Sequence, residues 1–207
     1  MGIDAHRMMA FLSPAFPTGA FAYSHGLEQA IADGAVTDAG SLANWLETLL
    51  RHGAPWNDAV LFAAAMRGED VADLAEALAG SRERHTETMN QGAAFARTAS
   101  AVLGEAIAPA ALSVAVAQAA RAAGISAEAM LPLYLHAVMA NLVSVAVRLV
   151  PLGQTDGQIV LHGLFGLIDD TASRALTSTV DDLGNAAWLS DIAAMRHETL
   201  ETRIFRS

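Results

Sequence analysis

The chain has 207 residues, 53% of them hydrophobic and 16% charged, which suits one domain with a single core. Its net charge of −10 argues against nucleic acid as a partner, because nucleic-acid affinity comes from basic groups that neutralise phosphates. All 12 basic residues are Arg and there is no Cys, which excludes lysine-dependent phosphate loops, disulfides and thiolate metal sites.

The alanine-rich composition and the capping signals predict an all-α fold, a single domain over residues 1–207 with eight to ten helices. No segment alternates polar and apolar residues for long enough to predict a strand. Ser24, Ser81 and Ser126 are expected N-caps, and Gly34 suits the position after a helix. The expected helices, in chain order, cover residues 24–32, 41–51, 55–66, 70–79, 81–103, 109–124, 126–150, 156–180 (one or two helices) and 188–195.

Residues 130–150 form the one stretch long enough to suggest a membrane helix. The stretch contains Pro132, His136, Asn141 and Arg148, each of which is costly in hydrocarbon. We therefore expect a buried core helix, in which His136 makes a hydrogen bond, and not a membrane span. The N-terminus has an early acid and no long apolar stretch, which makes it a poor signal peptide, so a cytoplasmic protein is expected.

The tract of residues 148–158 stops one apolar helix and starts another. Pro151 ends the first helix, Gly153 can take a left-handed backbone, and Thr155 with Gln158 has the spacing of a capping box. These roles do not explain why further polar residues crowd into the same tract. It is either a well-capped loop or a surface built for recognition.

Two enzymatic patterns are present in part. The segment of residues 22–26 resembles a nucleophile elbow around Ser24, but such an elbow needs a strand before it. His25 with Glu28, and His197 with Glu201, have the spacing of helical metal ligands, but neither helix carries a second pair. A metal-dependent or hydrolytic helical enzyme using Ser24, His25 and Glu28 therefore stays as the alternative hypothesis.

The last residues, 195–207, alternate in charge yet contain Leu200, Ile204 and Phe205. A chain end of this kind frays unless its apolar residues find a surface. That surface belongs either to this domain or to a partner, and Phe with Arg is a combination that interface hot spots favour.

Three motifs in the same order are similar to the urease accessory protein UreF family. The first covers residues 17–28, the second runs from residues 140–144 into residues 148–158, and the third covers residues 191–198 and the ending 203–207. The resemblance extends from near the N-terminus to the last residue, although the helices between the motifs match only in pattern.

The resemblance implies a non-catalytic, all-helical, dimeric chaperone for assembly of the urease nickel site. Its implied partners are a UreD/UreH-type accessory protein, the UreG-type GTPase and apo-urease, with GTP hydrolysis coupled to nickel delivery. No cofactor would be bound tightly, because the assembled complex would handle the nickel, and neither nucleic acid nor a membrane would take part.

The resemblance also supplies candidate partner-binding residues. The tail of residues 195–207 would bind the UreD-type protein and the tract of residues 148–158 would face the GTPase. On this basis a chain truncated after Ala194 is expected to fold but not to bind. The candidates are Tyr23, Ser24, Glu28, Arg148, Gln154, Thr155, Asp156, Gln158, Met195, Arg196, His197, Glu198, Arg203, Phe205 and Arg206.

Overall fold

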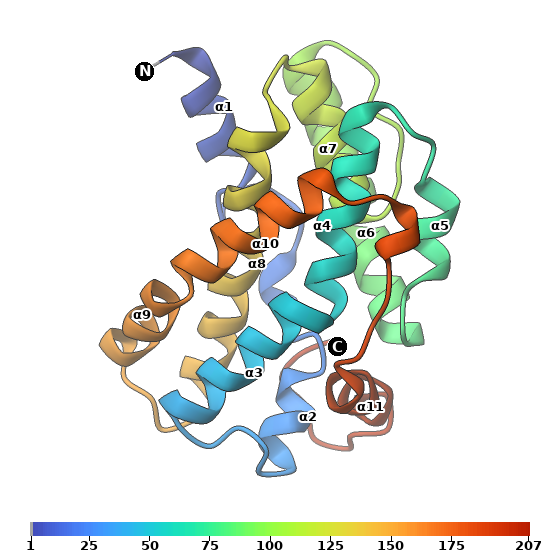
Figure 1. Cartoon of the computed structure of the whole chain (residues 1–207). Coiled ribbons are helices and arrows are strands. Elements are labelled where there is room, and N and C mark those ends of the chain that lie inside the picture. Colours follow the sequence, from blue (N-terminus) through green and yellow to red (C-terminus); the bar gives the residue numbers. More distant parts are fainter. Residues whose placement is uncertain (1) are drawn as a thin grey trace.

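The computed structural model describes residues 2–207, and over these residues it is helical with no strand, which confirms the predicted all-α class (Figure 1). In chain order its helices are α1 (Ile3–Phe11), η1 (Ala20–Ala22), α2 (Leu27–Ala32), α3 (Ala39–His52), α4 (Ala54–Arg67), α5 (Ala72–Ala77), α6 (Arg82–Leu103), α7 (Leu112–Ala122), α8 (Ala127–Leu149), α9 (Gln154–Gly163), α10 (Phe165–Thr177), η2 (Val180–Asp182) and α11 (Trp188–His197).

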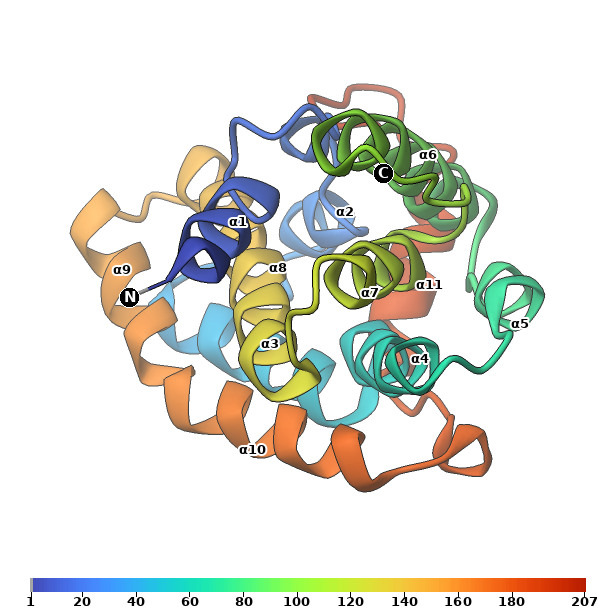
Figure 2. The ribbon, with the colours of Figure 1, turned by 90° about the horizontal axis from the view of Figure 1, so that it is seen from above.

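The middle of the molecule is made by helices that are apolar on nearly every side. Helix α4 is buried from Pro55 through Ala65 apart from Asp58, and α7 lies between α4 and α6 (Figure 2). Small side chains let these helices approach closely. A Cβ added to Gly92 of α6 would lie 1.8 Å from the carbonyl oxygen of Ala110, so only glycine fits there.

Helix α8 serves as a core helix. It is long and apolar enough to span a bilayer, with a mean hydropathy of 1.7 over 18 residues. However, it packs against α2, α4, α9 and α10 and buries side chains on several sides, including Leu135, Met139 and Leu142. The expected hydrogen bond of His136 is wrong. Its ring is half-buried near the surface and packs 5.4 Å from the ring of Phe165.

Most predicted helix starts are confirmed, and the errors have local causes. Ser81 and Ser126 accept hydrogen bonds from backbone N–H groups three residues ahead, as N-caps do. Ser24 does not occupy the N-cap position, because α2 begins later, after a left-handed Gly26. Its hydroxyl nevertheless accepts a hydrogen bond from the Glu28 N–H in the first turn at 3.3 Å, and it also bonds to the C-terminal tail.

The capping prediction in the 148–158 tract is also wrong. Helix α9 begins at Gln154, before Thr155, and the residue that caps it is Asp156, whose carboxylate accepts a hydrogen bond from the Gly153 N–H at 3.3 Å. Gly153 has an extended backbone with φ of −70°, and not the left-handed conformation expected for it.

Candidate functional site

The C-terminal residues return to the domain and lie across the start of the chain. The Arg206 N–H donates to the Ala22 carbonyl at 2.8 Å, and the Ser24 N–H donates to the Ser207 carbonyl at 2.8 Å. The Ser24 hydroxyl donates to the same carbonyl. The Phe205 side chain is buried, with 3% of its surface exposed. The surface that this tail needs is therefore provided by the chain's own domain.

The Glu28 side chain holds the tail through backbone N–H groups of the tail. Its buried carboxylate accepts hydrogen bonds from the N–H groups of Ile204 at 2.7 Å and Phe205 at 2.9 Å, and contacts His197 Nε2 at 3.0 Å. Burial alone would raise the pKa of Glu28, but the hydrogen bonds from His197 and the two backbone groups lower it below its ordinary value. Glu28 is therefore ionised at neutral pH, and its charge is balanced by donors from the tail.

His197 lies between two carboxylates. Its Nε2 faces Glu28, and its Nδ1 lies 2.7 Å from Glu83, which also pairs with Arg203 at 2.5 Å. His197 is completely buried at the end of α11. Each of its two ring nitrogens therefore has a carboxylate partner. The cluster thus joins α2, α6, α11 and the tail.

A second buried carboxylate holds the end of the tail. Glu87 accepts a hydrogen bond from the Ser207 hydroxyl at 2.6 Å and contacts His25 Nε2 at 2.8 Å, Gln91 Nε2 at 3.0 Å and the Arg84 guanidinium. Burial would raise the pKa of Glu87, but the charges of Arg84 and His25 and the hydrogen bonds lower it to about 2.

Glycine at position 26 permits the contact between α2 and α11. Gly26 has φ of +78°, and a Cβ there would lie 2.6 Å from the backbone nitrogen of Ala194. Any larger residue would be strained and would push α11 away. Tyr23 is buried beside this turn, where its carbonyl accepts from the Asn141 side chain at 3.4 Å.

The structure brings one member of the second motif to the tail. The Arg148 guanidinium lies 4.7 Å from the centre of the Phe205 ring, and its Nε donates to the Ser144 carbonyl at 3.0 Å. The other candidates in that motif lie elsewhere, on the exposed first turns of α9. These are Gln154, Thr155, Asp156 and Gln158.

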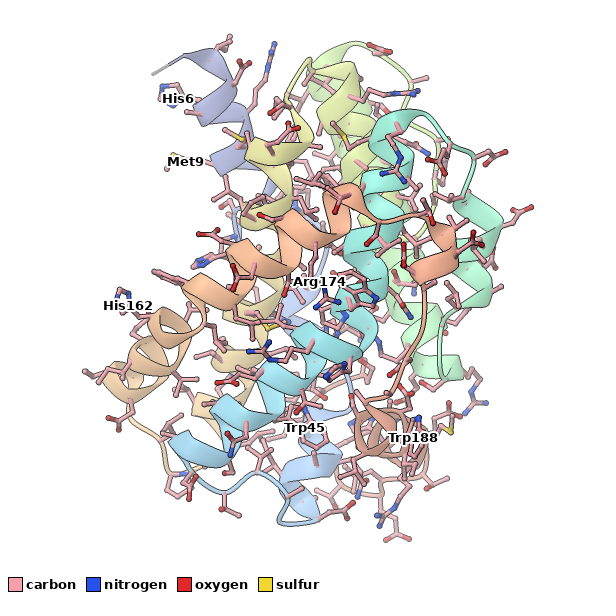
Figure 3. All side chains as sticks on the ribbon, in the orientation of Figure 1. His6, Met9, Trp45, His162, Arg174 and Trp188 are labelled. Carbon is pink, nitrogen blue, oxygen red and sulfur yellow. The ribbon has the colours of Figure 1, made fainter. Side chains whose placement is uncertain are left out.

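The outer face of α11 carries exposed apolar side chains. Trp188, Ile192 and Met195, at helical spacing, are 70%, 49% and 52% exposed, and Leu189 is 72% exposed. Figure 3 shows Trp188 on α11. Ile204 of the tail is 71% exposed. A helix that buries Ala193, Ala194 and His197 on one side thus presents a second apolar side to solvent. We call these five residues, Trp188, Leu189, Ile192, Met195 and Ile204, the α11 surface.

Charged residues rim the α11 surface. Arg196 pairs with Asp33 at 2.6 Å, and Glu198 pairs with Arg82 at 3.0 Å. Arg206 is exposed, although its backbone is bonded. An apolar centre with a polar rim is the usual composition of a protein–protein interface.

The comparison with known proteins identifies the family. A model of the UreF family matches residues 36–165. The urease accessory protein UreF of Mesorhizobium japonicum is 52% identical over 97% of this chain and 95% of its own length. The chain belongs to the UreF family. A UreF protein of Cereibacter sphaeroides strain KD131 is 53% identical over 97% of each chain, and one of Rhizobium etli strain CFN 42 is 52% identical over 97% of this chain.

In this UreF-family chain the structure separates the residues of the enzymatic alternative. Ser24 is bonded to the tail, His25 to Glu87 and Glu28 to His197, so these three side chains do not form a nucleophile and base. The spacing of His197 and Glu201 does not bring them together either, because His197 is bonded to Glu28 and Glu83 while Glu201 is exposed. Within residues 2–207 no group of three or more His, Asp or Glu side chains is placed to hold a metal ion.

Sequence reasoning missed part of the α11 surface. Trp188, Leu189 and Ile192 were assigned only to a last helical piece, although Trp188, Ile192 and Met195 follow the i, i+4, i+7 spacing of one helix face. That spacing was a usable signal, but it could not tell a buried face from an exposed one.

Proposed function

We propose that this chain is a urease accessory protein that takes part in maturation of the urease nickel site as a non-catalytic scaffold. The relatives that it matches over almost their entire length are named urease accessory protein UreF. The observation that carries the scaffold role is the α11 surface, an exposed apolar face. A buried polar cluster holds α11 and the tail in place, and its members Ser24, His25 and Glu28 form no catalytic arrangement with one another.

The α11 surface is the proposed docking site for a UreD/UreH-type accessory protein. Met195 and Ile204 would contact the partner directly, and Arg196, Glu198 and Arg206 would contribute to its rim. The buried members of the candidate set, Glu28, His197 and Phe205, would act indirectly by fixing the position of the tail. Tyr23 and Ser24 belong to this supporting group.

The exposed start of α9 is the proposed surface for a UreG-type GTPase. Gln154, Thr155, Asp156 and Gln158 offer hydrogen-bonding groups there that are free of the tail. Helices α9 and α11 lie apart, at the left and the lower right of Figure 1 with α2 and α3 between them, so two proteins could be held at once (Figure 1, Figure 2). The scaffold would then couple GTP hydrolysis by one partner to nickel delivery into apo-urease in the cytoplasm, as a homodimer with no tightly bound cofactor.

Affinity purification from the native host tests this function. The chain would carry its tag at the N-terminus, because the C-terminal residues are buried, and cells would be grown with urease expressed. We expect a small GTPase, a second accessory protein and urease subunits to co-purify. Recovery of the folded chain without any of these proteins would contradict the proposal.

A further inference from the structure

A large cavity lies beside α1, α6, α7 and α8, apart from the α11 surface. Its volume is about 680 Å³, within the range of cavities that hold small ligands. Apolar side chains from all four helices form its walls, including Met8, Phe95, Val116 and Leu133. Its lining also includes Gln154 and Gln158 of the proposed GTPase surface, but the proposed scaffold role does not use its apolar walls.

The cavity has a charged floor. Asp58, Arg84, Glu87 and His25 all line it, so two carboxylates face one guanidinium and one imidazole. Arg84 and His25 are both paired with Glu87. Both positive groups therefore pair with Glu87, and among the described residues no cationic side chain forms an ion pair with Asp58.

Asp58 is the carboxylate with acceptor capacity to spare. Its Oδ1 accepts a hydrogen bond from the Ser113 hydroxyl at 3.1 Å. A carboxylate can accept about four hydrogen bonds. Burial raises the pKa of Asp58, which means that its ionised form lacks full compensation from the protein.

The cavity can be entered from solvent. Leu133 and Phe21, which line it, are 42% and 49% exposed, and Met9 of α1 is 73% exposed. Helix α1 lies at the edge of the molecule and forms one wall of the cavity (Figure 1). A ligand that enters past these residues meets apolar walls first and the charged floor last.

We propose that this cavity binds a small amphipathic cation, an alkyl- or arylammonium or an amidinium, with its charged head at Asp58 and its apolar body between Met8, Phe95 and Leu133. A cation would pair with the Asp58 carboxylate and donate to its spare acceptor sites. An anion would meet two carboxylates, and a fully apolar ligand would leave the Asp58 carboxylate desolvated and unpaired. This inference is independent of the proposed role in urease maturation.

Binding of matched probes to the full-length chain tests the proposal. Hexylammonium, 1-hexanol and hexanoate share an alkyl chain and differ in head-group charge, and calorimetry gives their affinities. We expect saturable binding of hexylammonium, at least about tenfold tighter than that of hexanol and tighter still than that of hexanoate. Nuclear Overhauser effects between the probe and the methyl groups of Met8 and Leu133 would locate it.

Two variants and one control separate the cavity from the rest of the surface. In Asp58→Asn the preference for hexylammonium over hexanol should disappear, while the amide oxygen can still accept from Ser113. In Ala137→Trp, at the wall of the cavity, all probes should lose binding. Asp70→Asn, an exposed acid, should behave as wild type. Equal affinity for hexylammonium and hexanol in the wild type, or no saturable binding of hexylammonium, would overturn the proposal.

Discussion

Glu28 links the tail to the domain through three donors that come from far along the chain. Two of the donors are backbone N–H groups of the tail, at Ile204 and Phe205, and the third is His197. Replacement of a buried carboxylate in this arrangement should lower the stability of the fold, even when the replacement is the amide of the same size, glutamine. The amide has one acceptor oxygen, and its NH₂ group would face an N–H that needs an acceptor.

Glu28→Gln should therefore destabilise the chain by about 3 kcal/mol, because the buried network loses the carboxylate that accepts from two backbone N–H groups and pairs with His197. Urea unfolding followed by circular dichroism measures the difference. Glu47→Gln, at an exposed position of α3, is the matched control and should change the unfolding free energy by less than about 0.5 kcal/mol. A Glu28→Gln variant as stable as this control would contradict the assigned role.

The lowered pKa of Glu87 predicts how the stability of the chain depends on pH. Its pKa is about 2 in the folded chain against an ordinary value of 4.5. A carboxyl whose pKa is lowered by folding contributes stability that is present above the ordinary value and lost as the pH falls through the folded value. The urea concentration at the unfolding midpoint should therefore decrease as the pH is lowered from 4.5 to about 2. Glu28, whose pKa is also lowered, acts in the same direction.

The variant Glu87→Gln is the check on this acid dependence. It should be less stable at neutral pH, and its urea midpoint should depend less steeply on pH over the same interval than that of the wild type. The same slope in both proteins would show that other groups cause the acid dependence.

At this scale the sequence singles out several residues that the structure brings together, but it does not predict the contacts between them. Glu28 and His197 were singled out as members of separate local pairs, with His25 and with Glu201. In the structure they contact each other across 169 positions of the chain. Local spacing detects neighbours on one helix and cannot detect a partner brought in by tertiary packing. For the same reason the contact of Arg148 with Phe205 could not be predicted.

Among the elements, the helices were largely predictable because their ends carry capping residues. The starts of α6 and α8 follow from Ser81 and Ser126. The errors at α2 and α9 arise where a serine or threonine near the true start is not the N-cap residue. The Ser24 hydroxyl accepts from the Glu28 N–H and donates to the Ser207 carbonyl of the tail, and no local pattern indicates the second bond.

The contact between α8 and the tail gives a prediction at the scale of elements. Arg148→Ala removes the guanidinium over the Phe205 ring and should weaken the attachment of the tail by about 1 kcal/mol. Hydrogen exchange of the Phe205 N–H should become about fivefold faster, with the amides of α4 unchanged. Arg97→Ala, at an exposed position of α6, should leave this exchange rate unchanged, and equal effects of the two variants would refute the contact.

Over the molecule as a whole, the tail is part of the fold as well as a candidate for partner binding. Removing residues 195–207 would delete His197 and Phe205 and leave Glu28 and Glu87 buried without several of their donors. In contrast to the expectation drawn from the sequence, truncation after Ala194 should lower stability by at least about 3 kcal/mol. A truncated chain that melts at the same temperature as the wild type would contradict this account.

A truncated chain that fails to bind a partner would therefore say little about the α11 surface. Substitutions on the exposed side of α11 are a cleaner test, since Trp188 and Met195 are 70% and 52% exposed and contribute little to the core. Their matched control is Val102, which is 63% exposed near the far end of α6. It lies about 28 Å along the helix axis from Glu83, where α6 meets the tail.

The most direct test of the scaffold account is the affinity of the UreD/UreH-type accessory protein for the double variant Trp188→Glu, Met195→Glu, measured beside Val102→Glu and the wild type. The account predicts that the double variant melts as the wild type does and binds the partner at least about 100-fold more weakly, while Val102→Glu binds normally. Wild-type affinity in a folded double variant would show that α11 is not the docking surface.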